Sequence, residues 1–189
     1  LKLKPDREVE NYLKKIRQSS EYLMTLINDV LDISRIESGS LKLDNVDTSI
    51  TRLFQDTADT AREIQPEKHL QFFCDAHDIA YEHVLGDPLH LQQIYMNLLS
   101  NAVKYTPEGG EIHFEIYQEL LPHNHQLNLI SIIRDTGIGM SPEFMKEMYS
   151  KFSRAVDTRV NKVRGSGLGL TIVRELMELM QGTIHVQST

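Results

Sequence analysis

The sequence predicts an α+β fold, a two-layer sandwich of one mixed sheet against three helices, preceded by one long helix. Three observations support it. Apolar residues first recur at alternate spacings of three and four over residues 6–37. Strand-like and helical runs then alternate along the chain. Two strand-like runs, 111–117 and 127–135, are joined by a polar turn around 123–125, which predicts an antiparallel pair.

The composition is that of a globular protein, with 40% hydrophobic and 25% charged residues. A net charge of −7 argues against a general nucleic-acid binder, because phosphate backbones favour basic surfaces. The single cysteine, Cys74, excludes an intrachain disulfide and fits a reducing compartment such as the cytoplasm. No run reaches the roughly 18 to 20 apolar residues that cross a bilayer. Any membrane attachment is therefore expected through parts outside this sequence.

The opening helix carries a wide apolar stripe. It follows positions spaced alternately by three and four, which are Leu13, Ile16, Ser20, Leu23, Ile27, Val30 and Ser34, and it is widened by Leu26, Leu31 and Ile33. Such a stripe suits a helical bundle, so the helix requires a partner from another segment or another copy. The pair Ser38 and Gly39 is expected to end the helix.

The elements that follow are expected in a fixed order. Strands are predicted at 41–46, 70–75, 111–117, 127–135 and 183–186, and helices at 48–65, 87–105, 141–152 and 168–180. Asp87 is an expected N-cap with Pro88 at the first helical position, and Ser141 and Pro142 repeat this pattern. Residues 153–168 lack a hydrophobic period and are expected to form a loop.

The helix over 87–105 places three polar side chains together. Asn97, Asn101 and Lys104 are spaced by four and three, so they share one face. Amide oxygens suit a hard cation such as Mg²⁺, and a lysine supplies a positive charge for phosphate. The alternative is an ordinary solvated polar stripe.

A second segment, 135–139, combines a carboxylate with glycines. Asp135 can accept a hydrogen bond from an exocyclic amine, which adenine carries and guanine lacks at the matching place. Gly137 and Gly139 permit a sharp turn and close approach to a flat ring. A plain Asp-Thr-Gly turn is the alternative.

The third segment, 165–170, is rich in glycine and leads into a helix. Free backbone amides at a helix start favour anions, although this segment lacks the lysine of a Walker A loop. A flexible loop is the alternative. Upstream lies a group of basic residues, namely Lys151, Arg154, Arg159, Lys162 and Arg164.

Together these segments resemble the N, G1 and G2 boxes of two-component sensor histidine kinases. Residues 149–154 resemble the F box, and 31–39 resemble the second helix of the dimerisation and phosphotransfer hairpin. The resemblance covers nearly the whole chain. It implies an incomplete hairpin helix over 1–39 and a catalytic ATP-binding domain of the Bergerat fold over 40–189, with the last strand truncated.

The resemblance also implies the residue roles. The catalytic residues are Asn97, Lys104 and Arg154, and Asn97 and Asn101 hold Mg²⁺. The residues that bind ATP are Asn101, Tyr105, Asp135, Gly137, Gly139, Lys151, Gly165, Gly167, Leu168 and Gly169.

Position 97 separates a kinase from an ATPase. Related ATPases of this fold carry Glu there, which can act as general base on water, whereas Asn97 cannot take a proton. The expected reaction is therefore transfer of the γ-phosphate to a histidine, and onward to an aspartate on a response-regulator receiver domain. A Bergerat-fold ATPase and a catalytically silent ATP-binding module remain the alternatives.

None of the eight histidines lies in the sequence context of the family's phospho-acceptor, and none precedes His69. The acceptor helix is expected before residue 1. The chain is therefore expected to bind ATP and Mg²⁺ without phosphorylating itself. The family's hairpin further implies a homodimer in the full protein.

Overall fold

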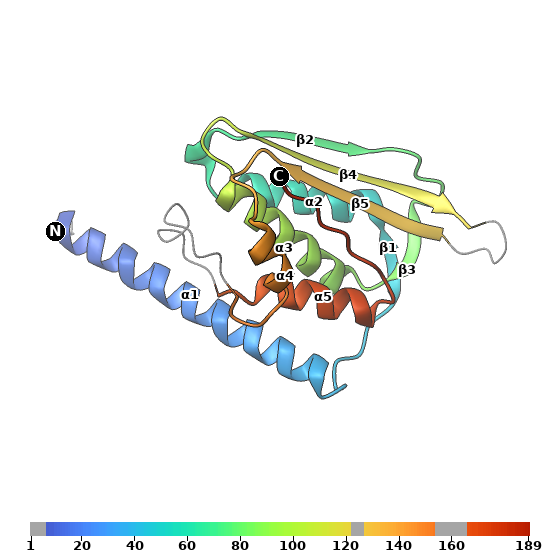
Figure 1. Cartoon of the computed structure of the whole chain (residues 1–189), viewed down its shortest axis with the longest axis horizontal. Coiled ribbons are helices and arrows are strands. Elements are labelled where there is room, and N and C mark those ends of the chain that lie inside the picture. Colours follow the sequence, from blue (N-terminus) through green and yellow to red (C-terminus); the bar gives the residue numbers. More distant parts are fainter. Residues whose placement is uncertain (1–6, 122–126, 154–165) are drawn as a thin grey trace, which may run out of the picture. The chain divides into compact units, whose positions relative to one another are not determined.

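The computed structural model describes residues 7–121, 127–153 and 166–189 (Figure 1). The chain divides into two units between Leu41 and Lys42. The first contains helix α1 (Arg7–Glu37), which confirms the long opening helix. It ends where expected, since Gly39 adopts a φ of +64° and donates its N–H to the Ile36 carbonyl at 2.9 Å.

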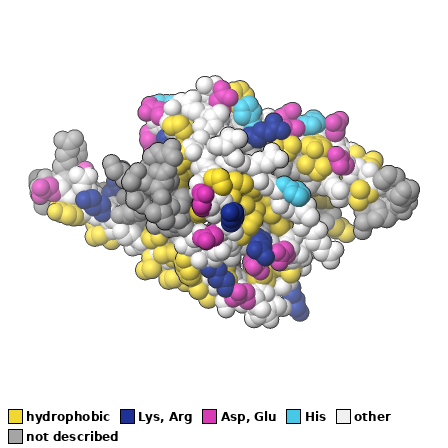
Figure 2. Space-filling model, in the orientation of Figure 1, with side chains coloured by type: hydrophobic (Ala, Val, Ile, Leu, Met, Phe, Trp, Pro, Cys, Tyr) yellow, Lys and Arg dark blue, Asp and Glu magenta, His cyan; other side chains and the backbone are white. Residues whose placement is uncertain are grey.

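Helix α1 exposes much of its apolar stripe. Its exposed large apolar side chains include Val9, Tyr12, Leu13, Ile16, Leu23, Met24, Ile27, Val30 and Leu31. Figure 2 shows apolar side chains gathered along this helix. A stripe of this size on a helix surface is typical of a bundle element that packs against partner helices.

The second unit is built on a mixed sheet, as the sequence predicts. Strand β2 (Gln71–Ala76) runs parallel to β4 (Glu111–Leu120), and β5 (Leu127–Asp135) runs antiparallel to β4. A separate two-stranded antiparallel sheet joins β1 (Val46–Ser49) to β3 (His83–Gly86). The turn expected at 123–125 lies outside the described residues.

Three helices cover one face of the mixed sheet (Figure 1). They are α2 (Ile50–Arg62), α3 (Pro88–Tyr105) and α5 (Gly169–Leu179). Helix α3 packs against both α2 and α5, so it lies in the middle of the helical layer. A short helix α4 (Pro142–Glu147) and a 3₁₀ turn η1 (Pro66–Lys68) complete the helical elements of the described chain.

The core lies between β4 and the helices. Ile112, Phe114 and Ile116 are buried at alternate positions of β4. The Phe114 ring centroid lies 4.4 Å from that of Phe54 on α2 and 5.2 Å from that of Tyr95 on α3. These aromatic contacts fix α3 over the sheet.

The start of α3 is capped as predicted. Asp87 accepts a hydrogen bond from the His90 N–H at 3.0 Å, with Pro88 at the first helical position. The other oxygen of Asp87 accepts the Asp44 N–H at 2.8 Å. One buried carboxylate thus begins the helix and holds the chain that leads into β1.

The structure departs from the prediction in three strands. The first strand begins at Val46 rather than at residue 41, because its partner is β3, which the sequence analysis missed. The segment 183–186 has no strand assigned, although Ile184 and Val186 are half-buried and alternate with exposed residues. Strand β4 extends to Leu120, three residues beyond the predicted end.

The helix predicted over 141–152 is much shorter in the structure. Helix α4 stops at Glu147, and Phe152 adopts a φ of +62°, which a right-handed helix does not contain. The helices predicted at 48–65 and 168–180 are confirmed with ends shifted by one to three residues.

Candidate functional site

Helix α3 places the three polar residues of the first segment on one face. Asn97, Asn101 and Lys104 are all half-buried, whereas Leu99 and Val103 point into the core. The Lys104 ammonium lies 5.0 Å from the centre of the Tyr105 ring, within range of a cation–π contact. The half-burial means that these polar groups line a partly enclosed surface.

The start of α5 lies directly against this face. A Cβ atom built on Gly169 would stand 2.9 Å from Asn97 Oδ1. Real Cβ atoms essentially never approach so closely, so only glycine fits here without a shift of the Asn97 side chain. The third segment of the sequence therefore meets the first at this glycine.

Helix α5 begins without a side-chain cap among the described residues. Leu168 occupies the N-cap position and is 1% exposed, and its own N–H is donated to Ser166 Oγ at 3.2 Å. The first backbone N–H groups of a helix have no intrahelical partner and carry the positive end of its dipole. This helix start thus offers anion-binding donors beside Asn97.

The second segment lies against the other end of α3. The carboxylate of Asp135 is exposed and accepts the Gly137 N–H at 2.9 Å. Ile138 donates its N–H to the Tyr105 carbonyl at 3.3 Å, and a Cβ on Gly137 would stand 3.0 Å from that same oxygen. The structure therefore brings Asp135 and Gly137 next to Tyr105.

The chain following Gly137 contacts the last residues of the sequence. Gly139 has a φ of +68°, and a Cβ there would collide with the Thr189 carbonyl. Met140 donates its N–H to Ser188 Oγ at 2.7 Å. The extended chain after α5 thus supports the Asp135 loop.

The residues on either side of 154–165 are joined to each other. Gly167 has a φ of +71°, and a Cβ there would stand 2.9 Å from both the carbonyl carbon of Phe152 and the oxygen of Ser153. Thr171 Oγ1 donates to the Tyr149 carbonyl at 3.0 Å. The start of α5 and the glycine before it therefore contact the residues that follow α4, from Tyr149 to Ser153.

Two predicted site residues, Arg154 and Gly165, lie outside the described residues. Lys151 is described and exposed. The structure brings Asn97 to Gly169, and Tyr105 to Asp135 and Gly137, from segments far apart in the chain. The roles of the individual residues remain predictions.

Sequence reasoning missed several residues that support this region. The Lys68 ammonium donates to the carbonyls of Val103, Lys104 and Thr106 at the end of α3. Thr171 and Ser188 make the contacts given above. These three side chains bond to backbone atoms that are distant in the sequence. A sequence pattern over neighbouring residues therefore cannot predict their contacts.

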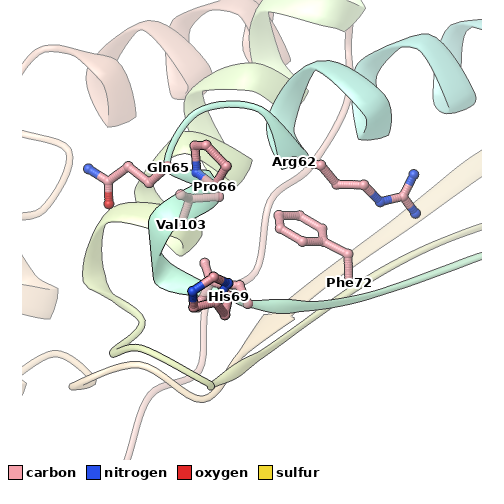
Figure 3. Close-up of a pocket in the computed structure, with 7 residues that line it drawn as sticks. Arg62, Gln65, Pro66, His69, Phe72 and Val103 are labelled. Atoms are coloured by element: carbon pink, nitrogen blue, oxygen red, sulfur yellow. The ribbon is translucent and has the colours of Figure 1, made fainter.

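A surface pocket lies beside η1 and the end of α3 (Figure 3). It is lined by Arg62, Gln65, Pro66, His69, Leu70, Phe72 and Val103. None of these residues belongs to the predicted site. The Arg62 guanidinium lies 5.8 Å from the Phe72 ring centre.

Two kinds of feature are absent from the described parts of the chain. No cluster of three or more His, Cys, Asp or Glu side chains there could hold a metal ion. The half-buried amides of Asn97 and Asn101 fit Mg²⁺, which takes few protein ligands and completes its shell with water and phosphate. Within those same residues, every helix is too short or too polar to cross a membrane.

Comparison with known families matches both units of the chain. Residues 86–189 match the family of histidine kinase-, DNA gyrase B- and HSP90-like ATPases. Residues 1–39 match the His kinase A phospho-acceptor domain. The first match covers α3 and α5 with the segments that carry Asn97, Asp135 and Gly169.

The chain is also similar to sensor kinases, in agreement with these family matches. The sensor protein GacS of Pseudomonas syringae pv. syringae is 36% identical over 179 residues, which are 95% of this chain and 20% of that protein. The signal transduction histidine-protein kinase BarA of Escherichia coli strain K12 is 32% identical over 178 residues, 94% of this chain and 19% of BarA. The chain thus spans about a fifth of the length of these relatives.

The fold of the chain is also similar to solved structures of histidine kinases. Full-length ShkA in complex with AMPPNP aligns with a TM-score of 0.74 at 27% identity, covering 95% of this chain and 35% of ShkA. The Acinetobacter baumannii histidine kinase AdeS shares the fold, with a TM-score of 0.72 at 22% identity over 98% of this chain and 80% of the AdeS chain. The chain therefore belongs to the sensor histidine kinases of two-component systems, as a segment of their phospho-acceptor domain followed by their ATP-binding catalytic core.

Proposed function

We propose that this chain holds ATP and Mg²⁺ and donates the γ-phosphate to a histidine on a dimerisation helix. The phosphoryl group then passes to an aspartate on the receiver domain of a response regulator. The observation that carries this proposal is the position of the Asn97 amide, which lies against Gly169 at the start of α5. An amide there can orient a metal and a phosphate, but it cannot deprotonate water.

The proposed roles follow the chemistry of each group. Amide oxygens of Asn97 and Asn101 hold Mg²⁺, and Lys104 neutralises phosphate charge. The N–H groups of Gly167 and of Gly169, just before and at the start of α5, are proposed to donate to the phosphates. Arg154 and Lys151 steady the γ-phosphate. The AMPPNP complex of ShkA supports a nucleotide site in this fold, since AMPPNP is an analogue of ATP.

The adenine end of the site is proposed at Asp135. Its exposed carboxylate can accept the adenine amine while its other contact, with the Gly137 N–H, holds the carboxylate in place. Gly137 and Gly139 shape this pocket by letting the loop pack closely on Tyr105 and on Thr189, and Tyr105 lines it. Gly165 and Leu168 border the phosphates.

The acceptor histidine is proposed to come from outside residues 1–39, since that segment contains no histidine. The exposed apolar stripe of α1 supports a helical bundle with a second hairpin helix and a second copy of the chain. Because ATP is abundant in the cytoplasm, the proposed place of action is cytoplasmic.

The two alternative functions make different demands on the site. An ATPase needs a base for water, and Asn97 does not provide one. A silent regulatory module would have no need for two amides and a lysine on one face of α3, beside the start of α5. Both alternatives give distinct outcomes in the experiments below.

The first experiment measures binding of ATP with Mg²⁺ by calorimetry for wild type and Asp135→Asn. The amide is nearly isosteric and still accepts from the Gly137 N–H, so the fold should persist. We expect affinity to fall by about 10- to 100-fold, in line with a lost charge-assisted hydrogen bond. The matched control is Asp47→Asn, an exposed carboxylate on β1, which should bind as wild type. Equal affinity for Asp135→Asn would remove the adenine role.

The second experiment supplies a histidine-bearing hairpin and γ-labelled ATP. We expect label on the histidine, with slow release of free phosphate when the hairpin is omitted. Rapid phosphate release without the hairpin would support the ATPase. Tight ATP binding with neither transfer nor release would support the silent module.

A further inference from the structure

Lys68 makes an unusual set of contacts at the end of α3. Its ammonium donates hydrogen bonds to the carbonyls of Val103 and Lys104 at 2.8 Å and of Thr106 at 2.9 Å. An ammonium has three protons, so these bonds use its full donor capacity. Lys68 is therefore engaged by the backbone of the helix and has no donor left for a phosphate.

These contacts complete the last turn of α3. The final carbonyls of a helix have no intrahelical donors and carry the negative end of its dipole. Here the Ala102 carbonyl accepts a hydrogen bond from the Thr106 N–H at 3.0 Å. The Lys68 ammonium donates to the carbonyls of residues 103, 104 and 106. The remaining one, Tyr105 O, accepts from the Ile138 N–H. Every carbonyl from 102 to 106 is thus satisfied.

The Tyr105 carbonyl joins this turn to the Asp135 loop. Gly137 packs on the same oxygen, and Gly137 in turn donates to the Asp135 carboxylate at 2.9 Å. The position of Asp135 therefore depends on the direction of the Tyr105 carbonyl. That direction depends on the turn that Lys68 holds.

Lys68 also ties down the chain that leaves α3. Its own carbonyl accepts the Gly109 N–H at 2.9 Å. The next residue, Gly110, lies so close to Thr136 that a Cβ there would stand 2.9 Å from Thr136 Oγ1. Thr136 directly follows Asp135, so Lys68 reaches the same loop by a second route.

We propose that Lys68 is a positioning residue of the nucleotide site, which holds the last turn of α3 so that Lys104, Tyr105 and Asp135 stand where the nucleotide is bound. This inference rests on the proposed function, because it acts through residues assigned to ATP. Lys68 itself does not contact the nucleotide in this proposal. Its removal should change affinity through the orientation of the residues it holds.

A purely stabilising cap would behave differently, and the chain offers a matched comparison. Asp87 caps the opposite end of the same helix. Asp87→Ala and Lys68→Met should both destabilise α3. Only Lys68→Met should disturb the end that carries Tyr105.

The experiment combines three measurements on wild type, Lys68→Met, Lys68→Arg and Asp87→Ala. They are urea unfolding, calorimetry with ATP and Mg²⁺, and hydrogen exchange of the Ile138 amide without nucleotide. We expect Lys68→Met to weaken ATP binding by about 10-fold, a loss typical of residues that orient a binding group without touching the ligand. We also expect the Ile138 amide to exchange faster than the loss in the free energy of unfolding alone would explain. Asp87→Ala should retain wild-type affinity. Lys68→Arg should recover part of the affinity, since a planar guanidinium cannot aim three protons from one atom.

Equal ATP affinity and equal Ile138 exchange in Lys68→Met and Asp87→Ala would overturn the proposal. Should Lys68→Met fail to fold, Lys68→Gln, which loses the charge and one donor proton, provides the same comparison with Asp87→Ala, and wild-type affinity and exchange in Lys68→Gln would count against the proposal. The exchange measurement needs no nucleotide. Its result therefore tests the role of Lys68 even if the proposed ATP site is wrong. The ATP site itself is tested by Asp135→Asn.

Discussion

Gly169 lies so close to Asn97 that a Cβ atom on it would stand 2.9 Å from the amide oxygen Oδ1. The two residues are 72 positions apart, on α5 and α3. In the proposed site, this contact places a metal ligand beside the donors of a helix start.

Replacing Gly169 by alanine should push the Asn97 amide aside. Because Gly169 is the first residue of α5 and does not have a positive φ, the change adds no backbone strain and can even favour the helix. We expect stability to change little while affinity for ATP with Mg²⁺ falls by about 10-fold. Calorimetry and urea unfolding measure the two effects. The control is Gly86→Ala, whose Cβ would meet Leu91 Cδ1 at an ordinary 3.7 Å. Wild-type affinity in Gly169→Ala would refute the assignment of Asn97.

Gly167 and Gly109 make a matched pair for backbone strain. Their φ values are +71° and +74°, so alanine at either costs about 1 kcal/mol of backbone strain. A Cβ on Gly109 meets nothing within 4 Å, whereas one on Gly167 meets the backbone of Phe152 and Ser153. Gly167→Ala should therefore lose more stability than Gly109→Ala and also bind ATP more weakly. Urea unfolding of both variants provides the comparison, and equal losses would contradict it.

Leu99 is fully buried in the middle of α3. Leu99→Ala should lower the free energy of unfolding by about 2–5 kcal/mol, because it removes buried apolar surface and leaves a cavity. Leu89 lies on the same helix and is 68% exposed, so Leu89→Ala should cost about 0.5 kcal/mol or less. Chemical denaturation of the two variants tests whether α3 packs as described. A loss for Leu99→Ala no larger than for Leu89→Ala would show that it does not.

Asp87 should make the domain sensitive to acid. Burial raises the pKa of its carboxyl. Hydrogen bonds from the Asp44 N–H, the His90 N–H and the His90 ring lower that pKa and together outweigh burial, so the pKa of Asp87 lies below its ordinary value. The unfolded chain then binds the proton more readily. The stabilisation is present above the unfolded value, about pH 4, and is lost as pH falls through the lower folded pKa.

Asp87→Asn tests this pH dependence while keeping an oxygen that can cap α3. The variant should lose stability at pH 7 and show a smaller further loss on acidification than wild type. Urea unfolding at neutral and acid pH measures both. Glu82→Gln is a useful comparison, because hydrogen bonds from the Ser49 and Thr51 hydroxyls lower the pKa of Glu82 at a different place. An acid loss in Asp87→Asn equal to that of wild type would exclude Asp87 as its source.

Local patterns predicted much of the architecture. Asp87 and Pro88 marked the start of α3 correctly, because capping depends on side chains next to the helix end. Strand β5 has the predicted bounds, since its apolar run is long and ends at Asp135. Strands β1 and β3 were misplaced or missed, because four-residue strands depend on each other rather than on their own pattern. The helix predicted over 141–152 stops at Glu147, and Phe152 has a positive φ that its side chain does not predict.

The sequence alone determined which chemical groups exist and which share an element. Two amides and a lysine on one helical face follow from spacing, because the period of a helix is constant. Only the tertiary structure decided which elements meet, since packing brings Gly169 to Asn97 and Tyr105 to Gly137. It also revealed Lys68, whose three partners are backbone carbonyls of another element. Every residue carries such a carbonyl, so residue types could not single out these three, whereas their convergence on one ammonium depends on how α3 and η1 pack.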